Sequence, residues 1–199
     1  MPSRPAVFLD RDDTLILCRE VSPDGDLGDP RLVRLAPGAV EACERLRAAG
    51  FVLVVVSNQG GVARGRYSPA DVDAVNRRIN ELLGGAISAF RFCPYHPGGT
   101  VARFAREHSW RKPSPGMVLD AAEVLGLDLS RSWLAGDSER DIAAGKAAGC
   151  RTVLLRNDST GTGRTTGLSA PDAVASDLAQ AAAIMLGDPA TFPQAVHRS

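Results

Sequence analysis

Four aspartates, a serine and a lysine stand where short apolar runs of the sequence end or where helices are expected to begin. These residues are Asp10, Asp12, Ser57, Lys112, Asp137 and Asp141. Carboxylates gathered in one crevice repel one another, and a hard cation such as Mg²⁺ neutralises such a cluster readily. A lysine and a hydroxyl are suited to bind phosphate oxygens, whose charge must be neutralised during phosphoryl transfer. These residue types together indicate magnesium-dependent phosphoryl transfer.

The segment Asp10-Arg11-Asp12 directly follows the apolar run 6–9. In extended backbone, residues two apart point to the same side, so both carboxylates can face one bound phosphate. A carboxylate can attack phosphorus to give an acyl phosphate, and a second can protonate the leaving oxygen and then deprotonate the hydrolytic water. We expect Asp10 to attack and Asp12 to be the acid and base. The alternative is an ordinary turn after a strand, where aspartate is common.

The other polar residues also have structural interpretations. The hydroxyl of Ser57 can bond to nearby backbone, and Lys112 can be an exposed surface charge. Asp137 at a strand end is expected to bind the metal. Asp141 falls in the first turn of a predicted helix, where an acidic residue favours the helix dipole, so it orients Lys112 or the metal-bound waters, or does neither.

Short apolar runs alternate with helical stretches, as in a parallel sheet covered on both faces by helices. Ligands of such doubly wound α/β folds bind beyond the carboxyl ends of the strands, where these polar residues fall. Strands are predicted at 6–9, 51–56, 89–93, 132–135 and 151–155, with an edge strand at 172–174. Helices are predicted at 37–49, 69–83, 115–125, 139–148 and 177–186, with N-caps at Ser68 and Ser176. Residues 15–35 and 94–112 are predicted to be irregular.

The composition is that of one compact domain spanning 1–199, with a core from about 5 to 186, a mobile polar stretch at 157–168 and a loose tail at 187–199. The 23 basic and 23 acidic residues balance, which predicts neither a nucleic-acid partner nor a membrane surface. Four scattered cysteines indicate reduced thiols in the cytoplasm, and no apolar run suits a signal peptide or a membrane span. We expect a monomer that acts on a small phosphorylated metabolite.

Four segments in order resemble the motifs of the haloacid dehalogenase-like (HAD) phosphatases over about residues 5 to 156. Phe8-Leu9-Asp10-Arg11-Asp12-Asp13-Thr14-Leu15 is similar to the first motif, Ser57 to the second, Lys112 to the third and Gly136-Asp137-Ser138-Glu139-Arg140-Asp141 to the fourth. The resemblance implies a Rossmann-like HAD fold and Mg²⁺ held by Asp10, the backbone carbonyl of Asp12, and Asp137. It also implies that a short loop insertion replaces a large cap.

Within that superfamily, the chain resembles the group of histidinol-phosphatases and D-glycero-D-manno-heptose-1,7-bisphosphate 7-phosphatases. The resembling segments are Ser57-Asn58-Gln59-Gly60-Gly61-Val62-Ala63-Arg64-Gly65, Cys93-Pro94-Tyr95-His96-Pro97-Gly98-Gly99 and Arg111-Lys112-Pro113-Ser114-Pro115-Gly116-Met117. The resemblance implies that Asn58 and Arg111 lie at the substrate. Arg64, Arg66 and Arg111 could hold a second phosphate, which favours a heptose bisphosphate over histidinol phosphate.

The sequence departs from this group at the insertion, where the group holds a structural zinc through a Cys-x-His pair and a Cys-x-Cys pair. Tyr95 and Trp110 occupy two of the four ligand positions and cannot bind zinc. A site of Cys93, His96 and His108 would lack a fourth ligand, so no zinc is predicted. Ser138 replaces the common lysine, and Asp13 stands where glycine is common; both put the substrate in doubt.

Two other functions stay open. One is a phosphosugar-binding or regulatory protein that keeps the fold without catalysis. The other is a nucleic-acid end-processing phosphatase, which the balanced charge disfavours.

Overall fold

The protein is seen in a computed structural model that describes residues 3–22, 25–156 and 170–188. Its centre is a six-stranded sheet in the order β3-β2-β1-β4-β5-β6, in which every neighbouring pair is parallel. The strands are β1 (Ala6–Leu9), β2 (Val52–Asn58), β3 (Ala89–Cys93), β4 (Trp133–Gly136), β5 (Arg151–Leu155) and β6 (Ala173–Ala175). The predicted doubly wound parallel fold is confirmed.

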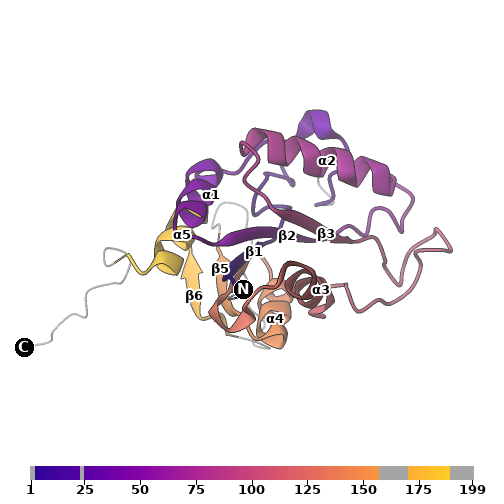
Figure 1. Ribbon diagram of the computed structural model, residues 1–199. Coiled ribbons are helices and arrows are strands. Elements are labelled where there is room, and N and C mark those ends of the chain that lie inside the picture. The colour runs from indigo at the N-terminus through magenta and orange to yellow at the C-terminus, as the bar shows by residue number, and fades with distance from the viewer. Residues whose placement is uncertain (1–2, 23–24, 157–169, 189–199) are drawn as a thin grey trace, which may run out of the picture.

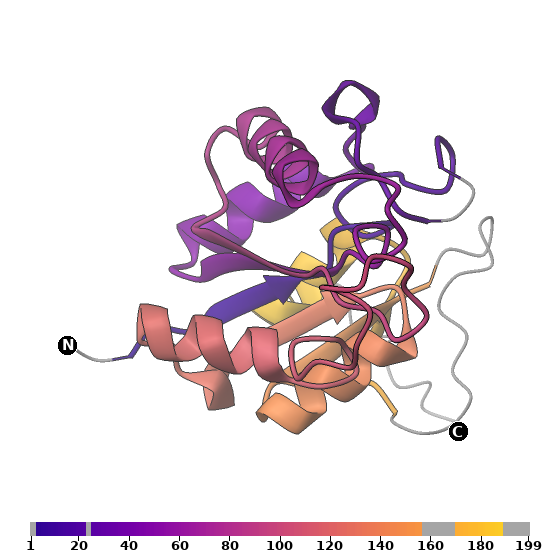
Figure 2. The same cartoon turned by 90° about the vertical axis from the view of Figure 1, so that its right-hand side faces the viewer.

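Helices cover both faces of this sheet. They are α1 (Ala39–Ala48), α2 (Pro69–Leu82), α3 (Gly116–Leu125), α4 (Glu139–Ala148) and α5 (Leu178–Leu186), with short 3₁₀ turns at Pro30–Leu32 and Leu129–Arg131. In Figure 1, α1 and α2 lie above the sheet and α3 and α4 below it. Figure 2 shows the strand arrows pointing toward one end of the molecule, where the loops that follow them gather.

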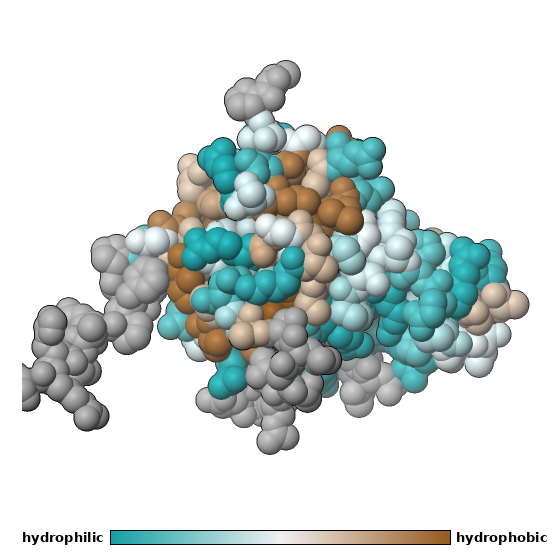
Figure 3. Space-filling view, turned by 90° about the horizontal axis from the view of Figure 1, so that it is seen from below, coloured by the Kyte–Doolittle hydropathy of each residue, from teal (hydrophilic) through white to brown (hydrophobic). Residues whose placement is uncertain are grey.

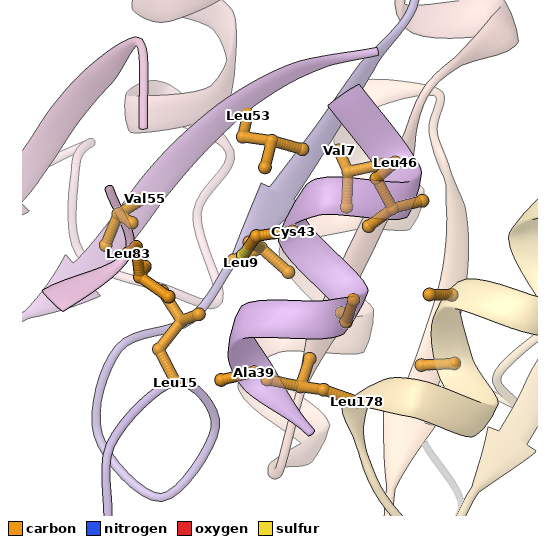
Figure 4. Close-up of a cluster of buried hydrophobic side chains, with 14 of the residues drawn as sticks. Val7, Leu9, Leu15, Ala39, Cys43, Leu46, Leu53, Val55, Leu83 and Leu178 are labelled. Atoms are coloured by element: carbon orange, nitrogen blue, oxygen red, sulfur yellow. The ribbon is translucent and has the colours of Figure 1, made fainter. Parts of the chain in front are cut away.

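Alternate residues of each strand enter separate cores, as the two-residue period of a strand requires. Val7 and Leu9 of β1 face the core under α1, α2 and α5, whereas Ala6 and Phe8 face the core over α3 and α4. Figure 4 shows side chains of β1 and β2 packed between the sheet, α1 and the start of α5; those labelled are Val7, Leu9, Leu15, Ala39, Cys43, Leu46, Leu53, Val55, Leu83 and Leu178. Because the central strands β1, β2 and β4 are buried on both faces, they contain continuous apolar runs, as predicted, whereas β3 and β5 include an arginine.

Several predicted boundaries move by one or two residues. The first helix begins at Ala39 rather than Pro37, because Gly38 adopts a left-handed conformation (φ 76°) at its N-cap. The N-cap of α5 is Asp177, whose carboxylate accepts from the Gln180 amide, and not Ser176. Strand β2 extends through Asn58, so Ser57 and Asn58 lie in the strand instead of after it. The predicted cap at Ser68 is confirmed, with a full capping box to Asp71.

The C-terminal predictions lie largely outside the described residues, which include neither 157–169 nor 189–199. The predicted tail does not begin loosely, however. Gly187 is the left-handed C-cap of α5, and Asp188 forms an ion pair with Arg45 of α1. These two residues therefore belong to the packed α1 and α5 layer.

The face formed by α3 and α4 carries exposed apolar residues beside polar ones. Leu119 and Val124 of α3 are both exposed. Figure 3, which views the molecule from below, shows hydrophobic residues interspersed with hydrophilic ones on this face. Among the described residues, no helix has the length and apolar content needed to cross a membrane.

The serine that directly precedes β4 links β1 to the loop before β4. This link gives a test of the fold. Ser132 Oγ accepts from the Ala6 amide at 2.8 Å and donates to the Asp128 carbonyl at 2.5 Å, and the residue is fully buried. Ser132→Ala should lower the free energy of unfolding by about 1–3 kcal/mol, because the buried Ala6 amide loses its acceptor. Urea unfolding measures this change.

The matched control is Ser130→Ala, which removes an exposed hydroxyl that donates to Asp128 Oδ1. It should change the unfolding free energy by less than about 0.5 kcal/mol. Equal losses in the two variants would contradict the structural role assigned to Ser132.

Candidate active site

The site lies at the point where the strand order reverses. The chain adds β2 and β3 on one side of β1 and then crosses to add β4, β5 and β6 on the other side, and ligands of open α/β sheets bind in the crevice at such a reversal. Asp10 directly follows β1 and Asp137 directly follows β4. The Asp10 amide donates to the Ala135 carbonyl at 2.9 Å, which keeps the two strand ends together.

A polar pocket of about 250 Å³ opens at this crevice. Eight of the predicted site residues line it: Asp10, Asp12, Asn58, Arg64, Arg111, Lys112, Asp137 and Asp141, whereas Ser57 does not. Arg66, predicted to help hold a second phosphate, is not among its lining residues. Residues that are far apart in the sequence therefore line one cavity.

Lys112 is the centre of the charge arrangement. Its Nζ lies 2.5 Å from Asp10 Oδ1 and 2.6 Å from Asp141 Oδ1, and donates to the Val56 carbonyl at 2.8 Å. Its side chain is only 4% exposed, so it is no free surface charge. Asn58 holds the backbone of Lys112 from both sides, since its Oδ1 accepts from the Lys112 amide and its Nδ2 donates to the Lys112 carbonyl, each at 3.0 Å.

Burial and charge act in opposite directions on this group. Burial disfavours the charged ammonium of Lys112, but Asp10 and Asp141 outweigh it and raise its pKa. Burial also raises the pKa of Asp10 well above its usual value; Lys112 opposes that rise, and Asp141 and Asp137 add to it. Burial, with Asp141 next, raises the pKa of Asp137 to about 7. The carboxylates thus outnumber the one buried ammonium that stabilises them.

Asp141 serves two structural purposes that the sequence left as alternatives. Its Oδ2 accepts from the Ser138 amide at 3.1 Å and from Ser138 Oγ at 2.5 Å, which closes a capping box at the start of α4. Its Oδ1 pairs with Lys112. Gly136 makes room for it, because a Cβ there would lie 2.4 Å from the carboxyl carbon of Asp141.

Asp10, Asp137 and Asp141 could hold a metal ion, since each offers an oxygen and these oxygens lie within 4.8 Å of one another. Asp137 also faces Arg19, whose Nη1 is 3.7 Å from its Oδ2. Arg19 Nε is 3.3 Å from Asp13 Oδ2, and Asp13 adopts a left-handed backbone (φ 57°). The Asp13 carboxylate accepts from the Cys18 and Arg19 amides, which explains how an aspartate replaces glycine at this turn.

The Asp12 carboxylate is held by a buried network that the sequence prediction missed. Arg11 donates to it through Nε at 3.1 Å and Nη2 at 3.0 Å, and Arg11 is fully buried. Gln59 Nε2 donates to Asp12 Oδ2 and to Ser57 Oγ, both at 2.6 Å. Ser57 Oγ accepts from Gln59 and in turn donates to Asp12 Oδ2 at 3.4 Å.

The amide of Gln59 is fully used in this network. Its Oε1 accepts from Arg11 Nη2 at 2.7 Å and from the Tyr67 hydroxyl at 2.9 Å. The Tyr67 ring fits here because Gly28 and Gly61 leave space: a Cβ would lie 2.4 Å from the ring at Gly28 and 2.3 Å at Gly61. The glycines at positions 28 and 61 are the sequence feature that permits this close approach.

The mouth of the pocket is rich in cations. Arg64, Arg111 and Arg140 line it together with His96, and Arg64 pairs with Asp26. Burial lowers the pKa of Arg111, and the adjacent positive charge of Arg140 lowers it further. Burial, then Arg111 and Arg64, lower the pKa of His96. These groups repel one another, so an anion between them would be stabilised.

Comparisons with known proteins agree with this geometry. The HAD-hydrolase-like family model matches residues 109–181. A D-glycero-beta-D-manno-heptose-1,7-bisphosphate 7-phosphatase of Rhodopseudomonas palustris is 43% identical over 153 residues, which cover 74% of this chain and 81% of that protein. A D-glycero-D-manno-heptose-1,7-bisphosphate 7-phosphatase of Thermosynechococcus vestitus is 42% identical over 188 residues, covering 89% of this chain and 93% of that protein.

Among solved structures, a D,D-heptose 1,7-bisphosphate phosphatase from B. bronchiseptica, complexed with magnesium and phosphate, superposes with a TM-score of 0.77. It is 30% identical, and the match covers 92% of this chain and 98% of that one. The chain therefore belongs to the haloacid dehalogenase-like phosphatases, within the family of the heptose-1,7-bisphosphate 7-phosphatases.

Proposed function

We propose that the chain hydrolyses a phosphomonoester of a small sugar through an aspartyl-phosphate formed on Asp10. The observation that carries this proposal is the buried Lys112 ammonium, 2.5 Å from Asp10 Oδ1, at the floor of the pocket. An ammonium so placed can bind the phosphate oxygens beside the attacking carboxylate. It reduces repulsion between two anions that must approach each other.

The reaction has two steps. In the first, an Asp10 oxygen attacks phosphorus, the ester P–O bond breaks, and Asp12 gives a proton to the leaving sugar oxygen. In the second, Asp12 takes a proton from water as that water attacks the same phosphorus, which releases phosphate and restores Asp10. The contacts from Arg11 and Gln59 support this role, since they hold the Asp12 carboxylate at the pocket in one orientation.

The residues present fit a magnesium ion. Asp10 and Asp137, with the backbone carbonyl of Asp12, are the proposed ligands, and Asp141 completes the acidic cluster while it pairs with Lys112. Converging hard oxygen donors in excess over the one buried ammonium match the ligand preference of Mg²⁺. When bound, the ion supplies positive charge to the transferring phosphate oxygens.

The proposed substrate is D-glycero-D-manno-heptose 1,7-bisphosphate, cleaved at the 7-phosphate. The names of the relatives support this choice, and so do the cations at the pocket mouth, which suit a second phosphate. Histidinol phosphate, or another small metabolite, is the alternative within the same chemistry. A phosphosugar-binding protein without turnover is the alternative outside it.

We also propose that the enzyme works as a monomer in the cytoplasm and binds neither nucleic acid nor membranes. Four buried, unpaired cysteines support a reducing compartment. Balanced charge supports a small-molecule substrate.

Phosphate release from a panel of substrates tests the proposal directly. The panel comprises the heptose bisphosphate, other sugar phosphates, histidinol phosphate, nucleotides and phenyl phosphate, each with Mg²⁺ and with EDTA. We expect release that depends on Mg²⁺ and favours the heptose bisphosphate. Comparable low rates on every ester would retain the chemistry and reject the substrate, whereas no release from any would favour the binding-protein alternative.

Replacing either of the two aspartates with asparagine should lower the rate of turnover. Asp10→Asn should lower kcat by at least about a thousandfold, because the amide is a poor nucleophile, and Asp12→Asn by about 10²–10⁴-fold through loss of the acid. Rapid-quench and steady-state assays measure these rates, with circular dichroism to check the fold. Wild-type turnover in either variant would refute its assigned role.

Arg111 should matter for the second phosphate and not for the chemistry. Arg111→Ala should raise KM for the heptose bisphosphate by about tenfold or more, since a charge-assisted contact is lost, and should change kcat/KM for phenyl phosphate by less than about twofold. Arg131→Ala, at an exposed residue of the 3₁₀ turn, is the control. Equal losses on both substrates would place Arg111 at the reacting phosphate instead.

A further inference from the structure

The insertion between β3 and α3 contains neither a helix nor a strand, although all of it is described. Figure 1 shows it as a long loop that projects beside β3 and α3. In the insertion, residues that are neighbours in the sequence line different cavities. His96 and Arg111 line the active-site pocket, whereas Tyr95 and Trp110, next to them in sequence, line a separate aromatic depression.

Stacked rings connect the two arms of the insertion. Tyr95 lies parallel to His108 with 4.3 Å between ring centroids and an interplanar angle of 17°. Phe104 meets Tyr95 edge to face at 5.8 Å, and Trp110 meets His108 edge to face at 6.2 Å. The Arg106 guanidinium lies 4.4 Å over the Tyr95 ring. Offset stacked and edge-to-face pairs are the favourable ring geometries, so these contacts form one cluster.

Backbone groups of the same residues hold the two pocket residues in place. Arg111 Nη1 donates to the Tyr95 carbonyl at 3.3 Å, and the Arg111 amide donates to the His108 carbonyl at 2.9 Å. The His96 amide donates to the Phe104 carbonyl at 3.1 Å. A shift of the rings would therefore move Arg111 and His96 as well.

The residues of the insertion do not fit a zinc ion. Cys93 is fully buried, with its thiol 3.8 Å from the Tyr95 carbonyl, while His96 Nδ1 accepts from the Gly98 amide. His108 Nδ1 accepts from the Trp110 amide, and its ring is stacked on Tyr95. Within residues 3–22, 25–156 and 170–188, the one group of at least three metal-ligating side chains that converge is the aspartate cluster.

We propose that the ring cluster of Tyr95, Phe104, His108 and Trp110 is a metal-independent brace that positions Arg111 and His96 at the pocket mouth. The expected effect on substrate binding rests on the proposed function, in which Arg111 binds the second phosphate. The four are positioning residues. They act on the substrate through Arg111 and His96, and do not touch the reacting phosphate.

Limited trypsin digestion tests the brace without any use of activity. Arg103 and Arg106 are exposed within the insertion and report its opening. Tyr95→Ala should increase cleavage after these arginines by about tenfold, whereas Tyr95→Phe keeps the ring and should match the wild type. Cys93→Ala removes the thiol at the end of β3, directly before the insertion; it and EDTA treatment of the wild type should leave cleavage unchanged. Elemental analysis should find no stoichiometric zinc.

Kinetics tests the positioning of Arg111. Tyr95→Ala should raise KM for the heptose bisphosphate by about tenfold with kcat and phenyl phosphate turnover changed by less than about twofold, and Tyr95→Phe should restore KM. Phe104→Ala repeats the test if Tyr95→Ala does not fold. If the wild-type enzyme does not hydrolyse the heptose bisphosphate, the substrate proposal fails. The digestion experiment still decides whether the ring cluster holds the insertion.

Three results would overturn the brace. The first is evidence that a metal holds the loop: faster digestion of the wild type in EDTA, faster digestion of Cys93→Ala, or zinc bound at one ion per chain. The second is unchanged digestion of both Tyr95→Ala and Phe104→Ala. The third is faster digestion with unchanged KM, which would show that the rings hold the loop without positioning Arg111.

Discussion

The arrangement of the site depends on one buried ammonium between two carboxylates. Lys112 pairs with Asp10 from the end of β1 and with Asp141 from the start of α4, and its backbone is held by Asn58 of β2. Removing one member of such a buried pair leaves an uncompensated charge, which costs about 3–5 kcal/mol. The end of β1, the start of α4 and strand β2 must therefore all pack around the lysine if its charge is to be compensated. The same ammonium lies beside the proposed nucleophile, so in the proposed mechanism one interaction serves both folding and phosphate binding.

Much of this could be predicted from the sequence because parallel strands buried on both faces are continuously apolar and end abruptly in polar residues. Asp10 after 6–9 and Asp137 after 132–135 were recognisable for that reason, and the structure brings them to one pocket. Boundaries set by single hydrogen bonds were less predictable. Ser176 and Asp177 are both good N-caps, and the choice between them depends on which side chain reaches the Gln180 amide.

The network around Asp12 could not be predicted, because it joins residues whose pairing is decided only by tertiary structure. Arg11 reaches Gln59 across 48 positions, and Tyr67 reaches the same amide through space left by two glycines. An arginine between two aspartates is ordinarily expected to be exposed, yet here it is fully buried. Phosphate binding by Ser57 stays a prediction, and the contacts of its hydroxyl with Gln59 and Asp12 could not be read from the sequence either.

The charges of the pocket are segregated by depth, which separates reaction from recognition. The ammonium of Lys112 and the carboxylates of Asp10, Asp137 and Asp141 are buried at the bottom of the pocket. The guanidiniums of Arg64 and Arg111, on loops, and of Arg140, in the first turn of α4, are less buried and line the mouth. In the proposed mechanism the buried residues face the phosphate that is common to every phosphomonoester, so they need not change when the substrate changes. Substrate choice then depends on the position of the mouth residues. In this chain Tyr95 and Trp110 line a separate depression while the adjacent His96 and Arg111 line the pocket, so under the proposed brace the packing of the loop links its fold to the selection of the sugar.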